Sequence, residues 1–284
     1  MRKGKISRSA LNVAYLRALG TLNPIVPSFS DPYAEFFLPP RFAKNLANTR
    51  KKNEKHPASS QFLFWGRGMG IFYQFRTVIL DRAIQDALPV TQLVILGAGL
   101  DSRAWRLTGL ENTTVFEIDH PDTQKWKKEI ASHFPLLARE ICFAAVDFKV
   151  DDLVTQITEA GYNSDRQALW LMEGVSPYLP RAILAQTLAT IASLAPRGSR
   201  IAMSYMSKKN GQVPRSLYLK LTGEPIITGF TPGELAIFAA DVNWVTFTDT
   251  GIEDWKKILT PTLKLTAKDV GVQWFERIWL GTRQ

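Results

Sequence analysis

The chain has 284 residues and a formal net charge of +9, and 45% of its residues are hydrophobic. The apolar content supports a sizeable core, which excludes a globally disordered chain, and the length fits one large α/β domain or a domain with a smaller companion. The single cysteine, Cys142, excludes a disulfide framework within the chain, and no apolar run reaches the ~18 residues of a membrane-spanning helix. The basic start lacks the apolar centre of a signal peptide, so we expect a cytoplasmic protein.

The first ~90 residues are predicted to form a helical extension that prolines interrupt. Apolar residues recur at helical spacing over 7–19 and again over 74–88. Between these segments, 23–42 is rich in proline and indicates a loop with short helical turns. The basic residues of 50–55 are interpreted as part of a solvated loop.

From residue 92 onward, short apolar runs alternate with helical patterns. Such alternation predicts a parallel sheet with helices on both faces. A capping box from Thr231 to Glu234, with proline at the first helical position, predicts a helix before the last two strands. The predicted strands are 92–97, 113–119, 141–147, 168–174, 199–206, 243–249 and 275–281, and the helices between the first five are 101–107, 121–134, 151–161 and 180–195.

The first predicted strand leads directly into Gly97-Ala98-Gly99, and Asp101 follows two residues later. Glycines after such a strand let a nucleotide-containing ligand approach the backbone. A dinucleotide site requires a third glycine, where this chain has Ser102, and an acid at Asp101 is a poor neighbour for a pyrophosphate. The loop therefore argues against a nicotinamide or flavin enzyme.

An acid follows each of the first four predicted strands. After Asp101 come Glu117 and Asp119 on the second strand, Asp147 on the third and Glu173 on the fourth. Parallel strands end at one edge of the sheet, where ligands of open α/β sheets bind. Clustered carboxylates repel one another unless a cation or several hydrogen-bond donors lie between them. S-adenosylmethionine meets that requirement with its sulfonium, its amine and its ribose hydroxyls.

Five segments resemble the leucine carboxyl methyltransferases and their bacterial relatives, which are class I methyltransferases that use S-adenosylmethionine. The resemblance implies a Rossmann-like α/β fold with a seven-stranded, mostly parallel sheet and helices on both faces. It also implies an N-terminal helical extension over 1–90 and a methyltransferase domain over 91–284, with a substrate lid inserted at about 206–240. The similar segments are SDPYAEFF (30–37), FRTVILDRAI (75–84), VILGAGLDSRAWRL (94–107), FEIDHPDTQKWK (116–127) and LMEGVSPYLP (171–180).

The resemblance assigns residues to the methionine end of the cofactor. Arg76 matches the family's arginine, which pairs with the methionine carboxylate, and a guanidinium suits a carboxylate in a two-pronged contact. Glu173 is implied to lie near the methionine amine. Arg17, in the predicted N-terminal helix, is the candidate for a second basic residue against the same carboxylate.

The remaining cofactor contacts implied by the resemblance belong to the glycine loop and to the adenosine end. The backbone of the glycine loop, together with Asp101, is expected to pass close to the cofactor. Asp119 is expected to accept hydrogen bonds from the ribose hydroxyls, with Glu117 close behind it. Asp147 and Phe148 are expected to flank the adenine.

Methyl transfer to a carboxylate needs no general base, because a group with a pKa near ~4 is already ionised at neutral pH. The three histidines, His56, His120 and His133, are interpreted as structural. This favours methylation of a carboxylate, in a small metabolite or at the C-terminus of a peptide or protein, over methylation of a phenol. We expect no metal site.

Two residues are candidates for the catalytic side of the site. Tyr178 either orients the acceptor by its hydroxyl or packs under the lid, and Arg103 pairs either with an incoming carboxylate or with Asp119 or another nearby acid. In the lid insertion and at its start, the candidates for a wall of the acceptor site are Tyr205, Arg215, Tyr218 and Lys220.

The basic segments 2–8 and 50–55 leave a different class of function open, namely a nucleic-acid-binding protein or an RNA methyltransferase. Neither segment has aromatic residues interleaved with its charges, which argues against that interpretation. A mobile basic tail and a solvated loop explain the same charges.

Overall fold

The computed structural model describes residues 6–55, 67–146, 152–214 and 225–284. A seven-stranded sheet with the strand order β3-β2-β1-β4-β5-β7-β6 forms its centre. The first five strands pair in parallel, whereas β7 lies antiparallel between β5 and β6, so the predicted sheet is confirmed. The strands are β1 (Gln92–Leu96), β2 (Thr114–Asp119), β3 (Glu140–Ala145), β4 (Ala168–Met172), β5 (Arg200–Met206), β6 (Trp244–Gly251) and β7 (Glu276–Arg283).

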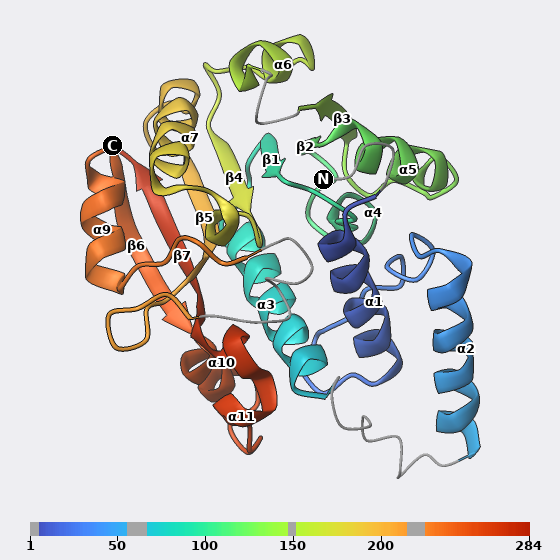
Figure 1. The fold of residues 1–284 in the computed structure, drawn as a ribbon. Coiled ribbons are helices and arrows are strands. Elements are labelled where there is room, and N and C mark those ends of the chain that lie inside the picture. The colour runs from blue at the N-terminus through green and yellow to red at the C-terminus, as the bar shows by residue number, and fades with distance from the viewer. Residues whose placement is uncertain (1–5, 56–66, 147–151, 215–224) are drawn as a thin grey trace.

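Helices cover both faces of this sheet, as Figure 1 shows. The predicted helix at the capping box is present, because the Thr231 hydroxyl accepts from the Glu234 backbone and the Glu234 carboxylate accepts in return. The helices are α1 (Arg8–Leu22), α2 (Pro40–Lys55), α3 (Arg67–Gln85), α4 (Arg103–Arg106), α5 (Pro121–Ala131), α6 (Leu153–Glu159), η1 (Ser176–Tyr178), α7 (Arg181–Leu194), α9 (Pro232–Ala240), α10 (Ile252–Leu259), α11 (Ala267–Val270) and η2 (Gly271–Phe275).

The alternating side chains of β1 show how the sheet divides the core. Leu93 and Ile95 belong to a cluster that includes buried residues of α1, α3 and α10. Val94 and Leu96 face the opposite side and pack with buried residues of α6, α7 and α9. A strand that is buried on both faces is typical of a parallel sheet between two helical layers, and it explains why these strands are continuous apolar runs.

The basic residues of 50–55 lie on helix α2, so their interpretation as a loop is wrong. The stretch after Pro40 contains neither glycine nor a further proline before residue 56, and alanine, lysine and arginine are good helix formers. Leu46 is buried in the core cluster and anchors the helix, while its charged side, including Lys44 and Lys51, is exposed.

Helix α3 is surrounded by segments from both ends of the chain. It packs against α1 and, from the C-terminal part, against α10, α11 and η2. Phe72 on α3 and Trp255 on α10 have ring centroids 6.1 Å apart. The three short helices between β6 and β7 have no counterpart among the sequence-based predictions, although they form much of the surroundings of α3. Across the described ranges, no helix combines the length and apolar character needed to cross a membrane.

Candidate cofactor site

The carboxyl ends of β1, β2 and β4 meet at one edge of the sheet, where Leu96 lies beside Ile118 on one side and Met172 on the other. Because β7 runs in the opposite direction, it is its first residue that reaches this edge, and Glu276 pairs with Met206 at the end of β5. The candidate site therefore combines strand ends from the middle of the chain with a strand start from its last tenth.

The glycine loop is held against the end of β2. The Ala98 amide donates to the Ile118 carbonyl at 3.1 Å, and the Gly99 amide donates to the Asp119 carboxylate. Gly97 has a φ of +64°, and a Cβ atom there would lie 2.5 Å from Val175 Cγ2. The loop thus offers backbone, without intervening side chains, directly beside an acid.

Asp119 retains the capacity to bind hydroxyl groups. Its Oδ2 accepts from Gly99 and its Oδ1 accepts from the His120 amide at 2.5 Å, which leaves a further lone pair on each oxygen. Burial raises the pKa of Asp119 even though both amides favour its charged form. An acceptor in this position fits a pair of ribose hydroxyls.

Glu117 lies deeper than Asp119. Its Oε2 accepts from the Lys127 ammonium, and both side chains are 1% exposed. Burial raises the pKa of Glu117, and the neighbouring Lys127 opposes that shift. Its other oxygen, Oε1, has no hydrogen-bond partner among the described residues. Glu117 is therefore a buried acid whose charge is paired with Lys127.

Arg76, in the middle of α3, forms ion pairs with two acids. Its Nε donates to Glu173 Oε1 at 2.9 Å, and its Nη1 donates to Glu276 Oε1 at 2.8 Å. Its guanidinium carbon lies 4.6 Å from the centre of the Tyr73 ring. Nη2 makes no hydrogen bond within the part of the chain that the structure describes.

Arg103 is fully buried in a network of acids. Its Nε donates to Asp81 Oδ1 at 2.7 Å, and its Nη1 donates to Glu173 Oε2 at 2.9 Å and to the Asp101 carboxylate. Of the two roles considered for Arg103, these contacts match pairing with nearby acids, although Asp119 is not among its partners. Burial raises the pKa of Glu173, but Arg103 and Arg76 outweigh that effect and hold it at about 2.

Asp101 turns away from the glycine loop toward α4. Its Oδ1 accepts from the Arg103 amide at 2.7 Å, and its side chain is 5% exposed. Arg17 lies beside the same loop, since its Nη2 donates to the Leu100 carbonyl at 2.5 Å and its Nε lies 3.4 Å from Asp31 Oδ2. Arg17 and Asp101 thus hold the loop in shape.

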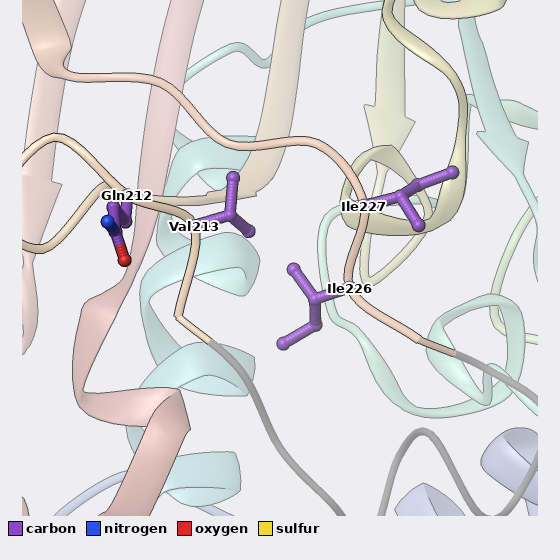
Figure 2. Close-up of a pocket in the computed structure, with 4 residues that line it drawn as sticks. All are labelled: Gln212, Val213, Ile226 and Ile227. Carbon is purple, nitrogen blue, oxygen red and sulfur yellow. The ribbon is translucent and has the colours of Figure 1, made fainter.

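Tyr178 lies half-buried on η1, directly after the acidic end of β4. The segment that contains Ile227 and Thr228 is tied to η1, because the amides of both residues donate to the Pro177 carbonyl, at 2.9 and 3.1 Å. A pocket opens beside this segment. Figure 2 shows the four residues that line it, Gln212, Val213, Ile226 and Ile227.

Several predicted residues lie elsewhere. Tyr205, on β5, has a buried ring, and its hydroxyl donates to Asp249 Oδ2 at 2.7 Å. A side chain buried in this way does not form a wall of an open site. The other candidates for the adenine contact and the lid wall, Asp147, Phe148, Arg215, Tyr218 and Lys220, lie outside the described residues.

Sequence reasoning missed the acids that hold the arginines. The sequence predicts Glu276 only as part of a terminal strand and Asp81 only as part of a helix. Asp81 also accepts from Arg106 Nη2 at 3.1 Å, so it links two arginines of α4. A signal for Glu276 was available, because an antiparallel last strand brings its first residues to the edge where the parallel strands end.

The sheet order and the glycine loop define a class I methyltransferase fold. A solved structure of a candidate methyltransferase from Thermobifida fusca has a TM-score of 0.58 with this chain, at 12% identity over 100% of this chain and 97% of that one. At that identity the likeness concerns the fold alone.

The sequence comparisons identify the family. The profile of the leucine carboxyl methyltransferase family matches residues 10–192. A protein of Mycobacterium avium named as a candidate S-adenosyl-L-methionine-dependent methyltransferase is 32% identical over 217 residues, which are 73% of this chain and 67% of that protein. A Streptomyces coelicolor protein with the same description is 30% identical over 73% of this chain and 68% of its own length. The chain belongs to the leucine carboxyl methyltransferase family, and it is a methyltransferase that depends on S-adenosylmethionine.

Proposed function

We propose that the protein transfers the methyl group of S-adenosylmethionine to a carboxylate oxygen and forms a methyl ester. The cofactor supplies a methyl group that its sulfonium makes electrophilic, so that a bond from the acceptor oxygen to carbon forms as the bond from sulfur to carbon breaks. The acceptor is a carboxylate of a small metabolite or of a peptide. The protein's part is to bind and align the two reactants.

The observation that carries this proposal is the pairing of Glu173 with two buried arginines, Arg76 and Arg103. This acid stands next to the η1 segment, and two arginines hold its pKa at about 2. A carboxylate with so low a pKa is too weak a base to take a proton from an alcohol or a phenol at neutral pH. An acceptor that arrives already ionised, as a carboxylic acid does at neutral pH, fits this arrangement.

The described histidines support the same conclusion. His120 begins α5, where its Nδ1 accepts from the Asp122 amide at 3.3 Å, and His133 is exposed just after that helix. His56 lies outside the described residues.

We also propose how the chain holds the cofactor. Asp119 accepts from the ribose hydroxyls, Arg76 Nη2 donates to the methionine carboxylate, and Glu173 accepts from the methionine ammonium. The backbone of the glycine loop passes beside the sulfur-bearing part. Asp119 supports its role because each of its oxygens keeps a further lone pair. Arg76 supports its role because Nη2 makes no hydrogen bond to described residues. Glu173 supports its role because it is an acid that lies beside the positively charged Arg76 just after β4.

At the scale of domains, we propose that residues 1–90 cap a methyltransferase domain formed by 91–284, with a lid inserted at about 206–240. Helices α1 and α3 carry Arg17 and Arg76 to the strand ends, which supports the cap. We propose that Tyr178 orients the acceptor, and that Arg103 acts through Glu173 and Asp101.

The test is the chemical nature of the transferred label. The protein is incubated with S-adenosylmethionine labelled in its methyl group and with a panel of carboxylic acids and short peptides that have free C-termini. We expect label that mild base releases as methanol, because esters hydrolyse under these conditions. The matched amides and phenols should accept no label. Transfer of base-stable label to a phenol or an amine would refute the carboxylate acceptor.

A further inference from the structure

The family profile ends at residue 192, so it does not cover Glu276. Glu276 is the first residue of β7, and its side chain is 6% exposed. Its only described side-chain partner is Arg76, whose Nη1 donates to Oε1 at 2.8 Å. Side chains alternate along β7, so Glu276 and Ile278 face α3 and its cluster, whereas Arg277 faces the other side.

The charges around Arg76 explain why a second acid is needed there. Glu173 is shared, because Oε1 accepts from Arg76 and Oε2 accepts from Arg103. Without Glu276, the buried guanidinium of Arg76 would have Glu173 as its one acidic partner among the described residues. A buried charge without a counter-ion is costly, so Arg76 would draw Glu173 more strongly toward itself.

We propose that Glu276 is a positioning residue for cofactor binding, which neutralises and orients Arg76 from the far end of the chain. It holds Nη1 in place, so that Nη2 stays aligned for the methionine carboxylate. Because Glu276 shares the neutralisation of Arg76, Glu173 also remains able to accept from the methionine ammonium. The inference rests on the role proposed for Arg76, and it deepens that role by adding the residue through which the C-terminal strand completes the site.

The experiment compares two ligands by calorimetry in Glu276→Gln. S-adenosylhomocysteine carries the amino-acid end, whereas 5′-methylthioadenosine lacks it. We expect the dissociation constant for S-adenosylhomocysteine to rise about tenfold and that for 5′-methylthioadenosine to change less than about twofold, as for one lost charge-assisted contact at the amino-acid end. Glu276→Ala should show the same selective loss.

Asp249→Asn is the matched control. It removes the acid that pairs with Arg277, the next residue of β7, at 2.7 Å between Asp249 Oδ1 and Arg277 Nε. This ion pair lies on the opposite face of the strand. The control therefore also removes an ion pair of β7, and we expect it to leave the affinities for both ligands unchanged.

The outcomes separate the inference from the proposed function. Arg76→Ala tests the latter, since it should abolish the preference for S-adenosylhomocysteine over 5′-methylthioadenosine. If Arg76→Ala does so but Glu276→Gln binds S-adenosylhomocysteine as Asp249→Asn does, or more tightly, the inference is refuted alone. Equal losses for both ligands would also refute it, because they would report general damage. If Arg76→Ala keeps the preference, the role of Arg76 itself is wrong.

Discussion

Asp119 and Glu173 are acids at the same edge of the sheet, and their surroundings shift their pKa values in opposite directions. Asp119 accepts from two backbone amides, and burial raises its pKa. Glu173 lies between Arg76 and Arg103, which hold its pKa at about 2. The first environment suits an acceptor for neutral hydroxyls, and the second suits a permanent negative charge opposite an ammonium.

Removing the charge of Asp119 should weaken every ligand that contains adenosine. For Asp119→Asn we expect about tenfold weaker binding of both S-adenosylhomocysteine and 5′-methylthioadenosine, because charge-assisted hydrogen bonds to the ribose are lost. Calorimetry measures both constants, and Asp122→Asn on the first turn of α5 is the control. Undiminished binding of 5′-methylthioadenosine would show that the ribose lies elsewhere.

The low pKa of Glu173 makes a prediction about stability and pH. A folded-state pKa of about 2, against an ordinary 4.5, means that its charge stabilises the folded protein above pH 4.5 and that this contribution is lost as the pH falls toward 2. The full pH-dependent part is about 3 kcal/mol.

Urea unfolding of the wild-type protein and of Glu173→Gln measures this effect. We expect the difference in the free energy of unfolding to be largest at pH 6 to 7 and to shrink steadily below pH ~4.5, where the ordinary carboxyl begins to take up its proton. A difference that stays constant from neutral pH down to pH ~3.5 would show that Glu173 has an ordinary pKa.

At the scale of elements, the conformation of the loop after β1 requires a residue without a Cβ atom at position 97. Gly97→Ala introduces two penalties, a φ of +64° and a Cβ atom 2.5 Å from Val175 Cγ2. We expect a loss of about 1–3 kcal/mol in unfolding free energy together with weaker binding of S-adenosylhomocysteine.

Two further variants separate the penalties. Gly161→Ala has the same left-handed backbone, with a φ of +95°, but nothing within 4 Å of its Cβ, so it reports the cost of backbone strain alone. The double variant Gly97→Ala/Val175→Ala should recover the part due to the clash. If it recovers nothing, the contact with Val175 does not limit the loop.

The elements that could be predicted from the sequence are those whose pattern is local. β1 to β4 are short apolar runs that end at a glycine or an acid, β5 is a further apolar run, and the structure confirms all five. Helix α2 is not predicted over 50–55, because a run of lysines and arginines resembles a solvated loop, although helix-forming residues and the buried Leu46 favour a helix there. The partners of Arg76 and Arg103 were missed because Glu276 and Asp81 reach them through strand order and helix packing, which no local pattern encodes.

At the scale of the whole molecule, the C-terminal elements α10, α11 and η2 pack against α3, the helix that carries Arg76. A Cβ atom on Gly68, at the start of α3, would lie 1.8 Å from the carbonyl oxygen of Asp269. For Gly68→Ala we therefore expect α3 and α11 to separate, with a loss of at least about 1–3 kcal/mol and a melting temperature several degrees lower.

Gly233→Ala in α9 is the control for this variant. It also replaces a helical glycine, but nothing lies within 4 Å of its Cβ. Alanine is the better helix former there, so the melting temperature should stay the same or rise slightly. Thermal unfolding followed by circular dichroism compares the two. An unchanged melting temperature for Gly68→Ala would show that α11 does not hold α3 tightly.

The reversed direction of β7 has a consequence for how the protein matures on the ribosome. The glycine loop, β1 to β5 and Arg76 are all synthesised before residue 210, yet Glu276 reaches Arg76 only when β7 has entered the sheet between β5 and β6. A nascent chain that ends before β7 contains most of the nucleotide-binding half, but its Arg76 lacks the counter-ion Glu276. Competence to hold the amino-acid end of the cofactor should therefore arise late in translation and abruptly.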